Sequence, residues 1–293
     1  MQLQIDNIKL RRKSLIILAL CCCFMCSAYS PSDTLSTSET LEKLFGKLIT
    51  EREDSVRLRV NDSIKTIVDK IVEADSIFDF NFTNVRFLGQ ITSTDSIIKI
   101  VSWNLNMRNE PSKYFSYIIK KNEPDKPNSI YKLTADYSLA DISKDTIYTC
   151  ENWYGALYYE IRPFIIDGEK RWIALGINYG NPLITKKVID VIGFNPDGVI
   201  EFGIPVFLYS ETEELRSREV FQYSADAAMT LRFLDDNTIV FDHLAPFAPE
   251  LVGRMEFYGP DFSQDAFIFQ DGMWNFNLDI DARNEERPML RNN

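Results

Sequence analysis

The chain has 293 residues, 45% of them hydrophobic, and a formal net charge of −11. This length and composition are sufficient for one large domain or two small ones, each with its own core. Because binding to nucleic acid requires a basic surface, the excess of acidic residues excludes a nucleic-acid-binding protein.

Residues 1–28 are predicted to form a secretory signal peptide. Four basic residues between positions 9 and 13 precede an apolar run over 15–25, which is too short to span a bilayer comfortably. Cys26 and Ala28 place small residues where a signal peptidase requires them, so we expect cleavage before Tyr29. An uncleaved membrane anchor is the alternative. Cleavage removes four basic residues and one acidic residue, which changes the net charge from −11 to −14.

The cysteines indicate where the protein resides. Four of the five lie inside the predicted signal peptide, so the mature chain retains Cys150 alone and cannot form an internal disulfide. An exported protein without disulfides favours a bacterial envelope over eukaryotic secretion. Leu20-Cys21-Cys22 before Cys23 loosely fits a lipoprotein signal, and a lipid on Cys23 would be the predicted contact with the membrane.

After a tether over 29–37, a helical segment is predicted over 38–77. Ser36 and Glu39 fit a capping box at its start. Apolar residues then recur at helical spacing at Leu41, Leu44, Phe45, Leu48, Val60, Ile64, Ile67, Val68, Ile71 and Val72. The stripe lacks a sustained heptad repeat, so packing against the protein's own sheet is favoured over a coiled coil with another chain.

Residues 78–284 are predicted to form a mainly β domain, followed by a tail over 285–293. Short β-rich runs alternate with turns, and no helical period lies between them, which indicates antiparallel sheets in a sandwich or a barrel-like arrangement. A small propeller is the alternative. The expected strands are 85–92, 97–105, 114–120, 130–137, 147–150, 154–166, 171–179, 187–194 and 199–202.

Two further hairpins are predicted near the C-terminus. The first joins 229–233 to 239–243 through an Asp/Asn turn, and the second joins 266–270 to 273–281 through Asp271-Gly272. In the last arm we expect one face to be buried and to carry Trp274, Phe276, Leu278 and Ile280.

Several catalytic patterns are missing from the sequence. There is no G-x-S-x-G, no phosphate-binding P-loop and no G-x-G-x-x-G, and one histidine with one mature cysteine cannot form a His/Cys zinc site. Asp242 and His243 are neighbours in a predicted strand, so their side chains point to opposite faces and Asp242 cannot orient the imidazole. We therefore predict a packed, structural His243, with a ligand-binding, pH-sensitive or catalytic role as the alternative.

The acids of the last hairpin form a candidate metal site: Asp261, Asp265, Asp279 and Asp281. The hairpin turn brings them together, and such a cluster needs a cation, an arginine or a raised pKa to relieve its repulsion. We favour an arginine, Arg254 or Arg283, over a bound calcium ion. Asp279 and Asp281 are also expected about 7 Å apart on one strand face, a separation that suits an inverting glycosidase.

Aromatic residues crowd one predicted hairpin arm and form the candidate ligand-binding residues Trp153, Tyr154 and Tyr158. If exposed, their rings could stack on sugars or form a surface for a partner protein. Strand alternation buries at least half of such a group, so a role in the core is the alternative.

Several strings resemble an uncharacterised exported family common in Bacteroidetes: NWYGALYYEI (152–161), TKKVIDVIGF (185–194), FGIPVF (202–207), FDHLAPF (241–247), YGPDFSQDAF (258–267) and LDIDARN (278–284). The resemblance covers about 78–284 and implies a location in the periplasm or cell envelope of a Gram-negative bacterium. It implies no activity, because no function is assigned to that family. The chain departs from the family at Cys150 and in its cysteine-rich signal peptide.

From these observations we expect an exported, non-catalytic binding or structural module. Its partner would be an envelope protein or a glycan, and no cofactor other than the calcium ion of the alternative above is expected. A glycan hydrolase that uses carboxylates is the second hypothesis. A hollow with two facing carboxylates and an exposed aromatic wall would favour the hydrolase, and a flat surface would favour the module.

Overall fold

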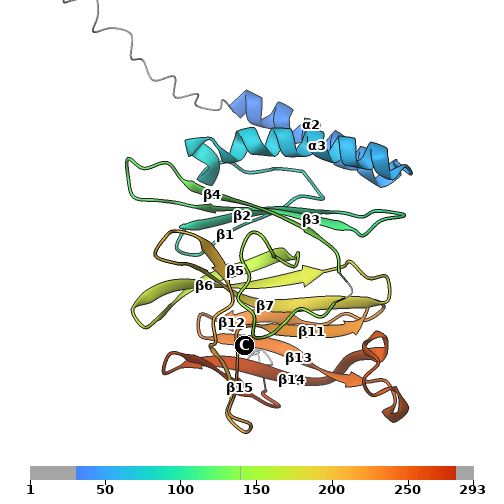
Figure 1. Ribbon diagram of the computed structural model, residues 1–293, viewed down its shortest axis with the longest axis vertical. Coiled ribbons are helices and arrows are strands. Elements are labelled where there is room, and N and C mark those ends of the chain that lie inside the picture. Colours follow the sequence, from blue (N-terminus) through green and yellow to red (C-terminus); the bar gives the residue numbers. More distant parts are fainter. Residues whose placement is uncertain (1–30, 139, 282–293) are drawn as a thin grey trace, which may run out of the picture.

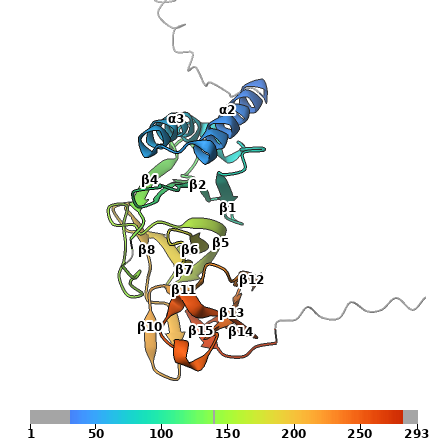
Figure 2. The same ribbon diagram turned by 90° about the vertical axis from the view of Figure 1, so that its right-hand side faces the viewer.

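The computed structural model describes residues 31–138 and 140–281. The expected signal peptide, its cysteines, Arg283 and the 285–293 tail lie outside these residues. The described chain forms a stack of four layers along its longest axis, with a pair of helices above three sheets (Figure 1). Turned by 90°, the same stack shows its layers edge on (Figure 2).

The first layer confirms the predicted helical segment. It contains α2 (Pro31–Thr50), α3 (Asp54–Val72) and the 3-10 turn η1 (Asp75–Phe78). The chain is already helical at Pro31, so the expected tether is shorter and Ser36 does not start the helix. Arg57 Nη1 donates to the carbonyls of Leu48 at 2.6 Å and Glu51 at 2.9 Å, which satisfies carbonyls at the end of α2. Neither described helix has the combination of length and apolar character that a bilayer span requires.

The first sheet is a meander of β1 (Gly89–Thr92), β2 (Ile98–Leu105), β3 (Lys113–Lys120) and β4 (Ser129–Asp136). Strand β2 is buried on both faces because its apolar residues occupy both parities. Val101 and Trp103 pack against the helices, whereas Ile98 and Ile100 pack against the next sheet. Trp103 Nε1 donates to Asn61 of α3 at 2.8 Å, which fixes the helix over the sheet.

The second sheet has the order β11 (Glu219–Ser224), β7 (Ile184–Phe194), β6 (Glu169–Asn178) and β5 (Leu157–Ile166), and β8 (Ile200–Phe202) pairs with the end of β7. Alternate side chains of β6 again point to opposite faces of the sheet and join two different hydrophobic cores. Trp172 faces the first sheet and Ile173 faces the third. The predicted turn between β5 and β6 is confirmed, and both Asp167 and Gly168 have the positive φ of a two-residue hairpin loop.

The third sheet has the order β10 (Glu214–Arg216), β9 (Phe207–Tyr209), β15 (Met273–Asn277), β14 (Tyr258–Gln270), β13 (Thr238–Pro246) and β12 (Leu231–Asp235). Two 3-10 turns, η2 (Pro249–Leu251) and η3 (Met255–Phe257), link β13 to β14. Phe241, Phe267 and Trp274 form the core against the second sheet. Both predicted C-terminal hairpins are confirmed.

The predicted mainly β, antiparallel class is confirmed as open sheets packed face to face. The described strands form neither a closed barrel-like sheet nor the radial blades of a propeller. Several details differ from expectation. Strands β9, β10 and β11 lie where no strand was expected. Segment 147–150 contributes only a bridge between Tyr148 and Phe202. β15 pairs in parallel with β9. β15 also ends at Asn277, and Leu278 is 61% exposed.

Candidate functional site

A pocket of about 740 Å³ lies in the third sheet beside β13 and β14. We call it the acidic pocket, and it is lined by Ala228, Asp242, Pro260, Phe262, Ser263, Gln264, Asp279, Ile280 and Asp281. The register between the two strands shifts between Asp242 and Leu244. Such a bulge redirects side chains and is frequent beside functional sites.

His243 sits at this bulge, without a partner residue in the strand ladder. Its Nδ1 lies 2.8 Å from Asp265 Oδ2, and its side chain is 39% exposed. The expectation of a packed histidine is therefore wrong, because the bulge removes His243 from the alternation that buries Ile239 and Phe241. Strand geometry predicted that Asp242 would not orient the imidazole. The carboxylate that contacts the imidazole is that of Asp265.

Asp265 connects His243 to the segment that follows β15. Its side chain is only 5% exposed, and its Oδ1 accepts the backbone N–H of Asp279 at 3.0 Å. The N–H of Ile280 donates to the carbonyl of Gln264 at 2.7 Å. These two bonds hold 279–280 against β14 after the ladder has ended. The expected proximity of the C-terminal end to Asp265 is thus confirmed for Asp279.

Two other acids near the pocket, Asp242 and Asp261, accept hydrogen bonds from neutral donors. Asp242 accepts from the N–H of Thr230 at 2.6 Å and from Gln264 Nε2 at 3.0 Å. Asp261 accepts from the hydroxyl of Ser263 at 2.7 Å and from its N–H at 3.0 Å. These bonds from Ser263 lower the pKa of Asp261, so this carboxylate is ionised at neutral pH.

Of the two expected arginine partners, Arg283 lies outside the described residues, and Arg254 forms no ion pair with Asp261 or Asp265. Arg254 instead forms its ion pair with Glu256 at 3.0 Å. In the residues that the structure covers, no group of three or more His, Cys, Asp or Glu side chains is arranged to hold a metal ion. The side chain that contacts Asp265 is His243, at 2.8 Å, and the sequence analysis did not foresee this contact because it favoured a core position for His243.

Phe262 lines the pocket with a side chain that is completely exposed. Its φ is +76°, a left-handed conformation that is rare for a bulky residue. Backbone of this kind persists where the surroundings impose it, and it concentrates at functional sites. Sequence analysis missed Phe262, and the available signal was the run of turn-forming residues Gly259-Pro260-Asp261 before it.

The aromatic candidates lie in the core between the first and second sheets. Trp153 is 4% exposed and Tyr158 is 2% exposed, so neither offers a ring face to a ligand. The hydroxyls of Tyr154 and Tyr158 donate to Asp190 Oδ2 at 2.6 Å and 3.2 Å. Burial, reinforced by the Asp190 charge, raises the pKa of both tyrosines well above the usual range. Tyr154 and Tyr158 therefore stabilise the buried Asp190 carboxylate. The aromatic candidates belong to the core, which was the alternative interpretation.

The acidic pocket combines carboxylate and amide oxygens, the Ser263 hydroxyl and one exposed ring. The oxygens can accept hydrogen bonds from hydroxyl groups, and the ring can stack on an apolar ligand face. Comparison with known proteins identified no matching family model, no matching curated protein and no matching solved structure.

Proposed function

We propose that this chain is an exported, non-catalytic binding module of a Gram-negative cell envelope, and that its acidic pocket binds a glycan. One observation carries the proposal: the completely exposed ring of Phe262 stands in the same hollow as the acceptor oxygens of Asp242, Gln264 and Asp279. Sugars present hydroxyl donors around an apolar ring face, which matches this combination.

Export is supported by the predicted signal peptide and by the family resemblance. We expect the mature chain to begin at Tyr29, or at one of Cys21–Cys23 in a lipidated form. Intact-mass measurement of the protein recovered from a Gram-negative envelope distinguishes these forms. A recovered chain that retains Met1 contradicts both.

The binding proposal is tested with Phe262→Ala and a matched control, Phe247→Ala. Both rings are exposed, at 100% and 61%, but Phe247 does not line the acidic pocket. Affinity electrophoresis against envelope polysaccharides and peptidoglycan fragments should show retardation of the wild type and of Phe247→Ala. Loss of one stacking contact should weaken binding by Phe262→Ala about tenfold. Equal retardation of the two variants contradicts the assignment of the pocket.

A glycan hydrolase is the second candidate, since Asp242, Asp279 and Asp281 line one hollow together with an exposed ring. Hydrolysis requires one carboxyl group as acid and a second as base or nucleophile. Release of reducing ends from a retained polysaccharide, abolished by Asp279→Asn or Asp281→Asn, would establish the hydrolase. Retention of the polysaccharide without any release would favour the binding module.

A further inference from the structure

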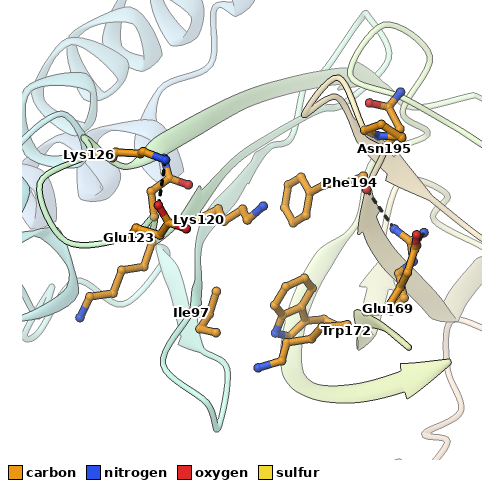
Figure 3. A pocket seen from close by; sticks show the side chains of 13 residues that line it. Ile97, Lys120, Glu123, Lys126, Glu169, Trp172, Phe194 and Asn195 are labelled. Atoms are coloured by element: carbon orange, nitrogen blue, oxygen red, sulfur yellow. Dashed lines mark hydrogen bonds and ion pairs between the residues drawn. The ribbon is translucent and has the colours of Figure 1, made fainter. Parts of the chain in front are cut away.

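A second pocket lies between the first and second sheets, beside the ends of β3 and β7 (Figure 3). Its volume is about 610 Å³, within the usual range for small-molecule sites. We call it the basic pocket, and its walls include Ile97, Lys120, Lys170, Trp172, Phe194 and Asn195. No candidate residue from the sequence analysis lies in it.

The charge of this pocket is opposite to that of the chain. Five basic side chains and only two acidic ones, Glu123 and Glu169, line it, whereas acidic residues outnumber basic ones in the whole chain by 43 to 32. Cations gathered in a hollow repel one another unless carboxylates or a bound anion compensate them. The partner of each cation therefore decides what the pocket can bind.

Three of the five cations have carboxylate partners. Lys126 pairs with Glu123 at 2.8 Å, Arg171 pairs with Glu169, and Lys170 reaches Asp95 at a longer 3.3 Å. A fourth, Lys121, places its ammonium 5.6 Å from the ring centre of Phe78, which does not line the pocket.

Lys120 is the cation that remains. Its Nζ lies 4.3 Å from the ring centre of Phe194, and among the described residues it forms no ion pair. Figure 3 shows its side chain reaching across the pocket toward that ring. A ring face attracts the ammonium but does not neutralise it. The half-buried charge is therefore available to an anion, and the apolar wall beside it strengthens the attraction.

The surrounding walls are held in place before any ligand arrives. Asp95 accepts the indole N–H of Trp172 and the backbone N–H of Ile97, each at 3.3 Å, and so ties the first sheet to the second. Trp172 packs edge-on against Phe194 with ring centres 5.8 Å apart. A site that is already ordered loses little conformational entropy on binding.

We propose that the basic pocket binds an oxyanion, the carboxylate or phosphate of a small organic ligand, with Lys120 as its principal charge partner and Lys170 as the second. This site is independent of the acidic pocket, so glycan binding there and oxyanion binding here can fail separately. An anion beside Lys120 would compensate a cation whose partner inside the pocket is the Phe194 ring and not a carboxylate.

The test uses isothermal titration of the mature chain at low ionic strength with inorganic phosphate, glucose 6-phosphate and glucuronate. Lys120→Met removes the charge and keeps the aliphatic stem. Lys113→Met is the matched control, since Lys113 begins the same strand β3 and pairs with Asp136, far from the pocket. We expect one site per chain, an affinity at least about tenfold lower in Lys120→Met, and an unchanged affinity in Lys113→Met.

The three probes separate the sources of the anion. Tighter binding of glucose 6-phosphate than of glucuronate assigns a phosphate ester, the reverse assigns a sugar acid, and phosphate alone assigns a free ion. Screening should weaken each interaction as salt rises to about 0.15 M. If Lys120→Met melts at a lower temperature than Lys113→Met, the affinity of Lys170→Met for the same probes is compared with that of Lys113→Met instead. No binding of any probe up to about 10 mM, or equal affinities of Lys120→Met and Lys113→Met, overturns the proposal.

Discussion

Arg218 and Asp190 form an ion pair in which both side chains are completely excluded from solvent, with Nε 3.3 Å from Oδ1. The guanidinium also donates to the carbonyls of Ser143, Thr146 and Phe202 at 2.5 to 2.7 Å. Because the two tyrosine hydroxyls complete the shell of Asp190, every strong charge in this part of the core has partners. The pair thus holds the 143–146 loop to the second sheet.

Removal of one partner should be severely destabilising. We expect Arg218→Met to lower the free energy of unfolding by about 3–5 kcal/mol, because it leaves the Asp190 carboxylate buried without its counter-charge. Urea denaturation at neutral pH measures the change. The control Arg254→Met removes an exposed pair with Glu256 and should cost less than about 1 kcal/mol. Adding Asp190→Leu to Arg218→Met should recover part of the loss, and equal stability of the two single variants would contradict the role of the buried pair.

The close approach of Gly203 to Arg218 gives a second test. Gly203 has a φ of +92°, and a Cβ there would collide with Arg218 Nη2. Gly198 has a similar φ of +78° but open space around it. Both alanine variants should lose about 1–2 kcal/mol from backbone strain, and Gly203→Ala should lose more because of the collision. Matching melting temperatures for the two would show that the guanidinium is not held where the structure places it.

Glu219 should make stability depend on pH. Burial raises its pKa above the usual 4.5, and the nearby charges of Lys144 and Arg216 offset this only in part. A carboxyl group with a raised folded-state pKa contributes full stability below its ordinary pKa and loses that contribution as pH rises through the raised value. The difference in unfolding free energy between wild type and Glu219→Gln should therefore shift in favour of the variant from pH 4.5 upward. Acids with lowered pKa values contribute equally to both proteins, so their effects cancel in the comparison. A shift in favour of the wild type would therefore refute the raised pKa of Glu219.

The end of β15 is tested by two residues of the same parity. Trp274 is 1% exposed and Leu278 is 61% exposed. Trp274→Ala should cost about 3–5 kcal/mol, as expected for a buried aromatic side chain. Leu278→Ala should remain within about 0.5 kcal/mol of the wild type, since surface changes rarely exceed that value. Comparable losses in both variants would mean that the strand continues past Asn277.

Calcium is tested by thermal melting with and without millimolar Ca²⁺, with a chelator as control. Asp265 has His243 and the Asp279 N–H as partners, and Asp261 has Ser263. We therefore expect no change in melting temperature. A cation bound to the native state alone at one hundred times its Kd would raise the melting temperature by about 5 °C for a chain of this size. A rise of that order would establish the metal site instead.

Local patterns predicted the helices and most of the strands, but they missed β9, β10 and β11. The helical stripe from Leu41 to Val72 and the Asp-Gly turns at 167–168 and 271–272 all occur as expected. These signals act within a few residues, because a helix repeats every 3.6 residues and a two-residue hairpin loop requires positive φ. The same hairpin geometry correctly predicted that Asp279 lies beside Asp265.

Long-range contacts decided what those patterns could not. The parallel pairing of β9 with β15 joins segments far apart in the chain, and neither strand carries a sign of its partner. The bulge at His243 also arises from the register of two complete strands. A shift of one residue reverses the face of every side chain that follows, so His243 was assigned to the wrong environment.

The sequence by itself determined most of the helical and β segments and the approach of Asp279 to Asp265 at the last hairpin, since each depends on spacing along the chain. The export signal remains a prediction. The tertiary structure alone decided the order of the layers, the burial of Trp153 and Tyr158 around Asp190, and the position of Lys120 over Phe194. Those relationships join residues from different segments of the chain, and in the case of Lys120 and Phe194 from different sheets. They are set by how whole apolar faces pack together, and no local period encodes which faces meet.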